Sequence, residues 1–380
     1  MAEQLDYSIV FKIKKISYNH SMKKTGVLLV NLGTPDSYKR KDVARYLGEF
    51  LMDGRVIDVP AILRFILVRL IIVPFRSIKV AKEYKKLWLE EGSPLLVYGK
   101  GLQKKVQEKF GKDIPVVLAM RYQNPSIEAG LDELRKQGVN RIIIFPLFPQ
   151  YASATVGSVA EKVMKLVSSW NVIPDVQFIN SYHEDSRYIQ NFVDKIRADI
   201  EKHQPDHLLF SYHGIPERHL RNMNKGTVRY CDNPTCPCSE GLPENNYCYR
   251  SACFQTTNLI VEKLNLPIDK YSTSFQSRLG SDPWIKPYTD ETIEELGKKG
   301  VKNLLVTSPS FVADCLETTL EIGEEYMELF EEHGGETFNF TESLNDDDAW
   351  AQTVYEMISE MIPENNATKE NITTNERTAV

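Results

Sequence analysis

Short apolar runs alternate with longer charged segments of helical period along most of this 380-residue chain. Each apolar run is rich in β-branched or aromatic residues and is bounded by turn residues, as buried strands are. Strands that alternate with helices form a parallel sheet that is covered by helices. We therefore predict an α/β fold of two Rossmann-like domains whose parallel sheets face a cleft. The candidate strands are residues 26–31, 115–120, 141–146, 175–180, 207–212, 271–276 and 303–307.

These candidate strands fall into two groups, three before and four after a break near residues 170–174. Residues 349–362 have the period of a last amphipathic helix, and the residues after them are polar. Met22 stands just before the first strand and is a second candidate start of translation. We expect an N-terminal extension at 1–24, a first domain at 25–172, a second domain at 173–345, a C-terminal helix at 346–362 and a polar tail at 363–380.

Charge and composition restrict the partners of the chain. Its net charge is −6, and it has no basic run with interleaved aromatic residues, which weighs against nucleic acid. Residues 1–24 lack the apolar core and the small-residue cleavage site of a signal peptide. We expect a cytoplasmic protein. No feature of the sequence indicates its oligomeric state.

Residues 61–75 form the most apolar stretch, called the lip segment below. It is shorter than the roughly 20 residues that span a bilayer, and it carries Arg64 and Arg69. One interpretation is an ordinary half-buried helix. The other is an apolar lip that touches a nonpolar substrate or the inner face of a membrane as a peripheral contact.

His213 follows the apolar run 207–212, and an acidic segment follows the run 303–307. In parallel α/β sheets, ligands bind beyond the carboxyl ends of the strands. Glu317, Glu321 and Glu325 are spaced four residues apart, so a helix places them on one face. A neutral imidazole that faces such carboxylates can accept protons or hold a divalent metal. By itself, the acidic row also fits a solvated helix face.

Five of the six cysteines lie within residues 225–253, a Pro- and Asn-rich insert. Such density in a chain without an export signal favours a metal site over disulfides. Four thiolates suit an iron–sulfur cluster or a structural zinc, and the lack of C-x2-C pairs favours a 2Fe-2S cluster. The predicted ligands are Cys231, Cys236, Cys238 and Cys248, with Cys253 as the alternate.

An ordered set of motifs, specific only as a set, spans residues 25 to about 362. It consists of Val30-Asn31-Leu32-Gly33-Thr34-Pro35, Met120-Arg121-Tyr122, Phe148-Pro149-Gln150-Tyr151, Thr155-Val156-Gly157-Ser158, Ser211-Tyr212-His213-Gly214-Ile215-Pro216, Phe275-Gln276-Ser277-Arg278-x-Gly280-x-x-Pro283-Trp284 and Pro309-x-Phe311-x-x-Asp314-x-Leu316-Glu317-Thr318. With these motifs the chain resembles the ferrochelatases, which insert ferrous iron into a porphyrin to make haem.

The resemblance implies a porphyrin cleft between the two domains and a C-terminal helix that returns to the first. It places His213 and Glu317 on opposite sides of the ring as catalytic residues and iron ligands. Asp314, Glu321 and Glu325 would form an acidic path for iron or protons. The porphyrin-binding residues would be Tyr46, Leu47, Phe50, Arg121, Tyr122 and Trp284, although Trp284 also fits a plain core aromatic.

Two departures from the animal members of the family concern metal ligands. Ser153 stands where they have a cluster cysteine, and the C-terminal tail has no cysteine. An animal-type cluster is therefore excluded, and any cluster must be built by the insert. Cys315 replaces a histidine, and we interpret it as a buried thiol or a soft metal contact.

The expected function is insertion of ferrous iron, as a substrate, into protoporphyrin IX with release of two protons, the last step of haem biosynthesis. The alternatives are a coproporphyrin ferrochelatase and, less favoured, a non-catalytic tetrapyrrole or iron–sulfur sensor. A cobalt or nickel chelatase for carboxylate-rich rings fits the apolar lip segment poorly. The presence of both His213 and Glu317 weighs against a pocket that binds without catalysing a reaction.

Overall fold

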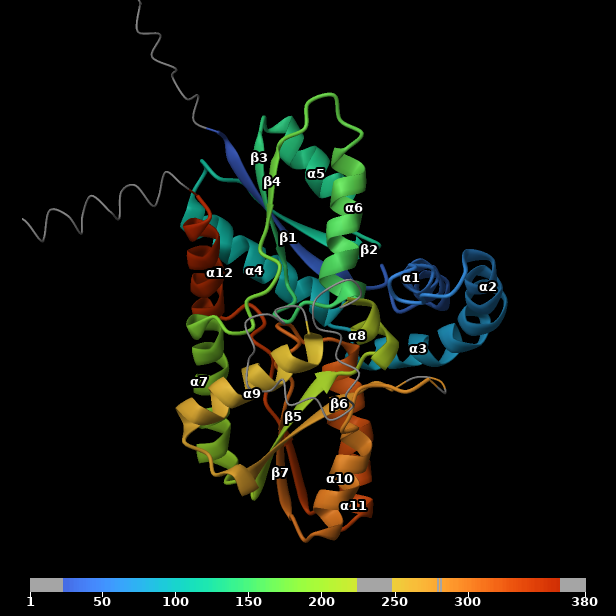
Figure 1. Cartoon of the computed structure of the whole chain (residues 1–380), viewed down its shortest axis with the longest axis vertical. Coiled ribbons are helices and arrows are strands. Elements are labelled where there is room, and N and C mark those ends of the chain that lie inside the picture. The colour runs from blue at the N-terminus through green and yellow to red at the C-terminus, as the bar shows by residue number, and fades with distance from the viewer. Residues whose placement is uncertain (1–22, 224–247, 279, 281, 363–380) are drawn as a thin grey trace, which may run out of the picture.

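The computed structural model describes residues 23–223, 248–278, 280 and 282–362 (Figure 1). Two four-stranded parallel sheets lie one above the other in this part of the chain. The first has the order β2-β1-β3-β4 and the second the order β6-β5-β7-β8, which confirms the predicted α/β fold class. The strands are β1 (Thr25–Gly33), β2 (Val116–Tyr122), β3 (Arg141–Pro146), β4 (Asp175–Phe178), β5 (His207–His213), β6 (Tyr271–Gln276), β7 (Asn303–Thr307) and β8 (Thr337–Phe340).

Two features of the strands differ from the sequence prediction. Strand β4 pairs with β3, with Arg141 opposite Asp175, so the first sheet extends beyond the expected break at residues 170–174. That break is only the turn before an edge strand. Strand β8 pairs with β7 and was not predicted, because its four residues are short of apolar side chains and lie at the sheet edge.

Helices cover both faces of the first sheet. Helix α4 packs on β1 and β2, and α5 and α6 pack on the sheet as well. Gly130 of α5 brings that helix close to the sheet, since a Cβ there would lie 2.7 Å from Cδ1 of Leu28. The bounds are α1 (Arg40–Leu51), α4 (Pro94–Phe110), α5 (Ile127–Lys136), the π-helix η2 (Ser153–Gly157) and α6 (Ser158–Val167).

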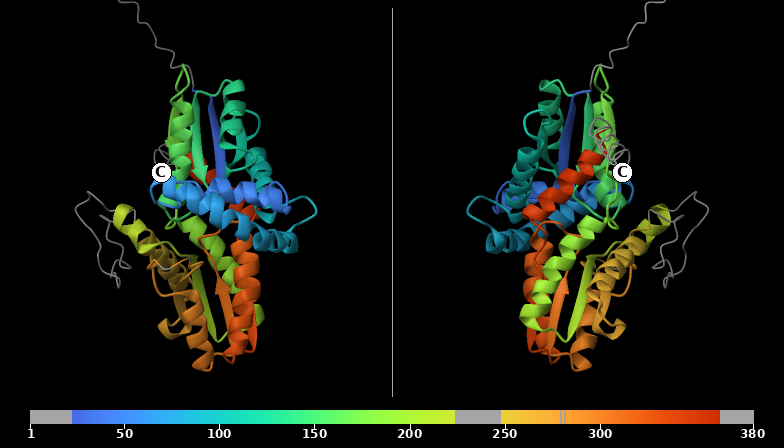
Figure 2. Two further views of the ribbon diagram at one scale, coloured as in Figure 1. Left: turned by 90° about the vertical axis from the view of Figure 1, so that its right-hand side faces the viewer. Right: turned by 90° about the vertical axis from the view of Figure 1, so that its left-hand side faces the viewer.

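The lip segment forms a projecting helical arm. It comprises α2 (Ala61–Phe65) and the π-helix η1 (Ile66–Ile72), and it leads into α3 (Val73–Leu87). Helix α3 packs against α1, and buried residues such as Val43, Leu47 and Val80 join the two helices. The views of Figure 2 show these helices lying across the gap between the two sheets.

The second sheet is covered in the same manner. Helices α7 and α9 pack on each other, as do α10 and α11. The acidic segment is a π-helix, η6, rather than the expected α-helix. The bounds are α7 (Ser186–His203), α8 (Glu217–Met223), α9 (Tyr249–Leu264), the 3-10 turn η5 (Ile268–Lys270), α10 (Thr289–Lys298), η6 (Glu317–Glu325), α11 (Tyr326–Glu332) and α12 (Asp348–Glu360).

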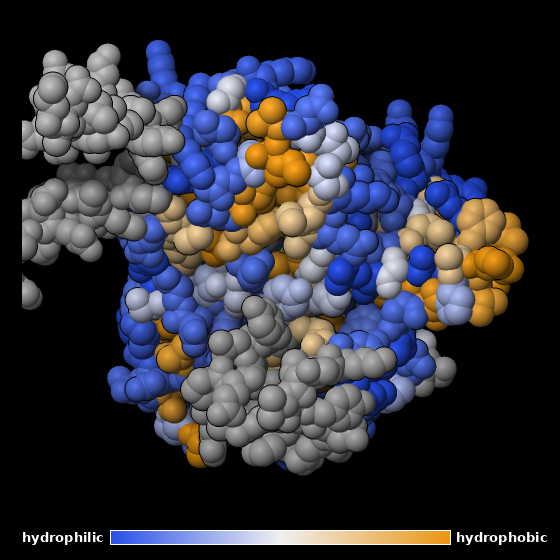
Figure 3. Space-filling view, turned by 45° about the horizontal axis from the view of Figure 1, so that its top comes forward, coloured by the Kyte–Doolittle hydropathy of each residue, from blue (hydrophilic) through white to orange (hydrophobic). Residues whose placement is uncertain are grey.

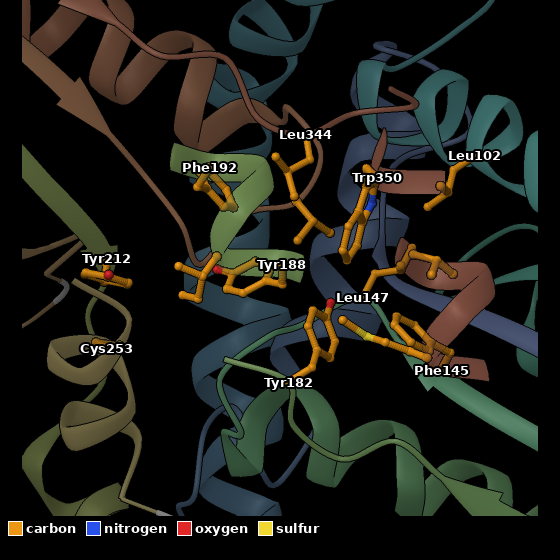
Figure 4. Close-up of a cluster of buried hydrophobic side chains, with 14 of the residues drawn as sticks. Leu102, Phe145, Leu147, Tyr182, Tyr188, Phe192, Tyr212, Cys253, Leu344 and Trp350 are labelled. Atoms are coloured by element: carbon orange, nitrogen blue, oxygen red, sulfur yellow. The ribbon is translucent and has the colours of Figure 1, made fainter. Parts of the chain in front are cut away.

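One apolar core runs through both domains (Figure 4). Its centre is Trp350 of α12, whose ring lies 5.9 Å from that of Tyr182 and 6.2 Å from that of Tyr188. Helix α12 packs on α4 of the first domain and on α7 of the second. The C-terminal helix therefore ties the two domains together on the side where they meet.

Several predictions lie outside the described residues. These are nearly all of the N-terminal extension, the tail from residue 363, and Cys231, Cys236 and Cys238 of the insert. Among the helices that are described, none combines the length and the apolar character needed to cross a membrane.

Candidate active site

His213 is the last residue of β5, at the carboxyl end of the second sheet, and its ring has one defined proton position. Its Nδ1 lies 2.6 Å from the backbone oxygen of Gly214. A carbonyl oxygen can only accept a hydrogen bond, so Nδ1 carries the proton and donates it. The lone pair of the neutral imidazole is therefore on Nε2, which can accept a proton or bind a metal.

The backbone and the aromatic neighbours of His213 hold its ring in place. The Gly214 N–H donates to the Gln276 carbonyl at 2.9 Å, and the Tyr249 hydroxyl donates to the His213 carbonyl at 2.8 Å. The His213 ring lies 6.2 Å from Phe311 and 6.5 Å from Trp284. Position 214 requires glycine, because a Cβ would lie 2.8 Å from the Gln276 oxygen.

Glu321 of η6 is the buried member of the acidic row, and Ser277 and Tyr326 anchor it. Its carboxylate accepts from the Ser277 N–H at 2.9 Å, the Ser277 hydroxyl at 2.7 Å and the Tyr326 hydroxyl at 3.1 Å. Burial raises the pKa of this carboxyl, although Ser277 and the nearby His213 oppose the shift and Glu317 adds to it. His213, Glu317 and Glu321 thus belong to one electrostatic site.

The row runs from the interior to solvent. Burial raises the pKa of both Cys315 and Tyr46, and the charge of Glu317 adds to this shift. Glu317 therefore lies near both groups. Glu325 is 61% exposed and lies 3.7 Å from the Lys79 ammonium. The spacing of four residues between these glutamates is close to one turn of either an α-helix or a π-helix. Short π-helical turns are frequent at functional sites.

Asp314 has a different environment from the glutamates. It accepts from Asn345 Nδ2 at 2.8 Å, from the Thr318 hydroxyl at 3.1 Å and from the Ser343 N–H at 3.3 Å. These contacts fix the start of η6 against the loop that follows β8. A place for Asp314 in the acidic path stays a prediction.

Asp53, which sequence reasoning missed, organises Arg121 and Tyr122. Its Oδ2 accepts from Arg121 Nη2 at 2.6 Å, from the Tyr122 hydroxyl at 2.9 Å and from the Ser158 hydroxyl at 2.5 Å. Although burial opposes the shift, the hydrogen bonds from Ser158, the Arg55 N–H and Tyr122 and the Arg121 charge hold its pKa below the usual value. Asp53 follows α1, and no local pattern marks it, because its side-chain partners are 68 or more residues away in the sequence.

The predicted porphyrin residues of α1 and β2 lie together. Tyr46 stacks on Phe50 with ring centres 6.0 Å apart, and Phe50 meets Tyr122 edge-on at 5.2 Å. Tyr46 and Leu47 are buried, and the Arg121 guanidinium lies 4.5 Å from the Tyr122 ring centre. Trp284 is not part of this wall and contacts His213 instead.

Two hollows lie beside this constellation. One of about 520 Å³ is lined by Arg45, Gly48, Glu49, Met52, Asp53, Arg69, Arg121 and Gln123. Another of about 400 Å³ is lined by Gly54, Arg55, Asp58, Tyr151, Ser153, His219, Asn222 and Met223. Neither hollow is lined by His213 or Glu317, so we base the site on the histidine, the carboxylates and the aromatic wall rather than on cavity size.

Comparison with known proteins assigns the chain to a family. The Ferrochelatase family profile matches residues 24–362. The chain belongs to the ferrochelatase family. The ferrochelatase of Coxiella burnetii (strain Dugway 5J108-111) is 45% identical over 334 residues, which are 88% of this chain and 93% of that protein. The ferrochelatase of Legionella pneumophila (strain Paris) is 44% identical over 341 residues, or 89% and 100%.

Among solved structures, SirB from Bacillus subtilis with Fe3+ matches with a TM-score of 0.49. The two chains are 12% identical, and the match covers 92% of this chain and 98% of the SirB chain. The membership in the ferrochelatase family rests on the sequence relatives alone.

The insert of this ferrochelatase is described only at its end. Cys248 is the N-cap residue just before α9, and Cys253 is fully buried in the shared core. Burial raises the pKa of the Cys253 thiol well above its usual value, and Tyr249 is its hydrogen-bond partner. Within the ranges that the structure describes, no group of three or more His, Cys, Asp or Glu side chains could hold a metal ion.

The anchoring of Glu321 predicts a change in pH dependence. Ser277→Ala removes a hydrogen bond that lowers the pKa of Glu321, so this pKa should rise further. Deprotonation then needs a higher pH, and the acid limb of the pH–rate profile of metal insertion should move to higher pH. Ser274→Ala in β6, three residues before Ser277, is the control, because the Ser274 hydroxyl pairs with Thr289. An acid limb that does not move, or moves to lower pH, would contradict this role of Ser277.

Proposed function

We propose that this ferrochelatase-family protein inserts Fe2+ into protoporphyrin IX, with His213 as proton acceptor and the η6 carboxylates as the route for metal or protons. The proposal is carried by one observation. The free Nε2 of His213 and the buried carboxylate of Glu321 belong to the same site but come from different elements. Iron is here a substrate, and the reaction releases both pyrrole protons of the free-base ring.

The chemistry assigns separate tasks to His213 and the carboxylates. As iron binds to the ring nitrogens, Nε2 of His213 accepts a pyrrole proton, and the resulting imidazolium is stabilised by the nearby carboxylates. Burial raises the pKa of Glu321, which suits this carboxyl to take up a proton from the site and pass it on. Glu317 and Glu325 extend this row inward and outward, and Glu317 is the second residue that we propose as an iron ligand.

Protoporphyrin is favoured over coproporphyrin because of the groups that face the ring. Tyr46 and Phe50 provide an apolar wall, and Arg45 and Arg121 are already paired with Asp36 and Asp53. The additional propionates of coproporphyrin would need additional cationic side chains around the ring. We also propose that rigid aromatic side chains grip the ring and bend it so that the pyrrole lone pairs become accessible.

The role of His213 predicts a selective loss of turnover. His213→Ala should lower metal insertion by at least 100-fold, since general bases contribute about 10²–10⁴-fold. Binding of protoporphyrin, measured by quenching of protein fluorescence, should stay within about threefold. The assay follows porphyrin absorbance under anaerobic conditions with Fe2+ or Zn2+, using protoporphyrin and coproporphyrin in parallel.

His203→Ala, at the end of α7, is the matched control and should leave turnover unchanged. Full turnover of His213→Ala would remove the proposed base. A preference for coproporphyrin with His213 still required would correct the substrate and leave the site intact.

We propose in addition that the enzyme is cytoplasmic and contacts the inner face of a membrane through the lip segment. Ile62, Leu70 and Phe75 are 77%, 63% and 74% exposed. Figure 3 shows apolar surface gathered on the side of the molecule where the α2 arm projects. Arg69 and Arg76 flank them and could meet lipid phosphates.

Flotation with anionic vesicles tests the lip proposal. Leu70→Ser together with Phe75→Ser removes two apolar contacts, so bound protein should fall by about tenfold while insertion into detergent-dispersed porphyrin continues. The control is Val172→Ser with Ile173→Ser, two exposed apolar residues on the loop after α6. Equal binding of the two double variants would contradict membrane contact by the lip.

For the insert we propose a 2Fe-2S cluster on Cys231, Cys236, Cys238 and Cys248, with a structural zinc as the alternative. Such a group would crosslink the insert or make it sensitive to redox state. Cys248 is preferred over Cys253 because it lies before the start of α9, at the end of the insert. Cys253 lies within α9, and burial raises the pKa of its thiol, which disfavours a thiolate ligand.

Analysis of iron, acid-labile sulfide and zinc in the purified full chain tests the cluster. Cys248→Ser should lose iron and sulfide together with the visible absorption of the cluster, whereas Cys253→Ser should keep them. Zinc at one equivalent without sulfide would favour the structural zinc. Retention of the metal by Cys248→Ser would contradict the proposed ligand set.

A further inference from the structure

Two ion pairs connect α3 of the first domain to the solvent end of the acidic row. The Lys79 ammonium lies 3.7 Å from Oε1 of Glu325, and the Lys86 ammonium pairs with Glu324. Helix α3 and η6 also pack against each other. Glu325, the outermost member of the row, and its neighbour Glu324 on η6 are therefore each paired with a lysine of α3.

The charges around these lysines are mainly acidic. Lys79 also lies 3.5 Å from Glu83, one turn along α3. Around Lys86, the hydrogen bond with Glu324 and the charges of Glu324, Glu328 and Glu83 raise the pKa of its ammonium. Lys86 thus carries a full positive charge at neutral pH.

These pairs contribute little to folding. The side chains of Lys79 and Lys86 are 75% and 61% exposed, and ion pairs in water add little to stability. A divalent cation that approaches the row from solvent meets them first. It must displace each ammonium from its carboxylate and overcome the repulsion between like charges.

We propose that Lys79 and Lys86 are competing cations that control access of divalent metal to the acidic row by occupying Glu325 and Glu324. The proposal rests on the proposed function, because it takes the row as the metal route. It assigns a role in metal access to residues of α3, which lie outside the set of His213, the carboxylates and the porphyrin wall.

The chemistry of lysine suits this role better than that of arginine. An ammonium is a compact point charge on a flexible stem, so it leaves a carboxylate easily when a metal arrives. A guanidinium forms two parallel hydrogen bonds with one carboxylate and is harder to displace. Replacement of the lysines by glutamine and by arginine should therefore change metal access in opposite directions.

The test measures KM for Zn2+ and, anaerobically, for Fe2+ with protoporphyrin as the second substrate. Lys79→Gln with Lys86→Gln should lower KM for the metal by about three- to tenfold at low ionic strength. Lys79→Arg with Lys86→Arg should raise it by about twofold or more. In both double variants, kcat and the porphyrin KM should stay within about twofold of wild type.

The matched control is Lys82→Gln, which removes the same charge from an exposed position of α3. Lys82 forms no ion pair with other described residues, so its replacement should change the metal KM by less than twofold. The differences between variants should vanish near 1 M salt, where the Debye length is about 3 Å.

Three outcomes would overturn the proposal. One is a metal KM of the glutamine double variant equal to that of Lys82→Gln. Another is a change confined to the porphyrin KM, which would mean that the pairs hold the lip region instead. The last is unchanged metal insertion by Glu321→Gln, which would remove the row as the metal and proton route and thereby the proposed function as well. If replacement of the lysines leaves the metal KM unchanged while Glu321→Gln loses activity, only the lysine proposal is contradicted.

Discussion

The shared apolar core is the constraint on which the rest of the structure depends. Trp350 of α12 packs between helices of both domains, against Tyr182 and Tyr188, and the apolar cluster around it contains residues of both sheets. The domains are therefore held rigidly along one side. The end of β5 with His213, and α1 with its aromatic wall, are positioned relative to each other by this packing rather than by contacts within the site.

Beside this core lie polar segments whose groups have defined partners. The Gly214 carbonyl fixes the protonated nitrogen of His213, Ser277 and Tyr326 hold Glu321, and Asp53 gathers Arg121 and Tyr122. Such pre-organisation lets the protein meet a changing charge without rearranging. By contrast, the lip segment exposes apolar side chains such as Ile62 and Leu70.

The local sequence pattern was sufficient to predict the strands with strong apolar character and the position of His213 at the end of β5. It was not sufficient where tertiary pairing decides the structure. Strand β8 is defined by its pairing with β7, and β4 belongs to the first sheet only because it pairs with β3. The spacing of Glu317, Glu321 and Glu325 predicted one face, but the π-helical geometry of η6 has no sequence signature. Asp53 and Lys79 were missed because their partners are distant in the chain.

The central claim is that a flat ring is held between one imidazole nitrogen and the inner carboxylates. A crystal structure of the full-length protein with bound free-base porphyrin tests it most directly. The account predicts a macrocycle with Nε2 of His213 over one face, Glu317 toward the other, and Tyr46 and Phe50 against its edge. A ring bound in the arginine-lined hollow beside Arg69, out of reach of His213, would contradict the account.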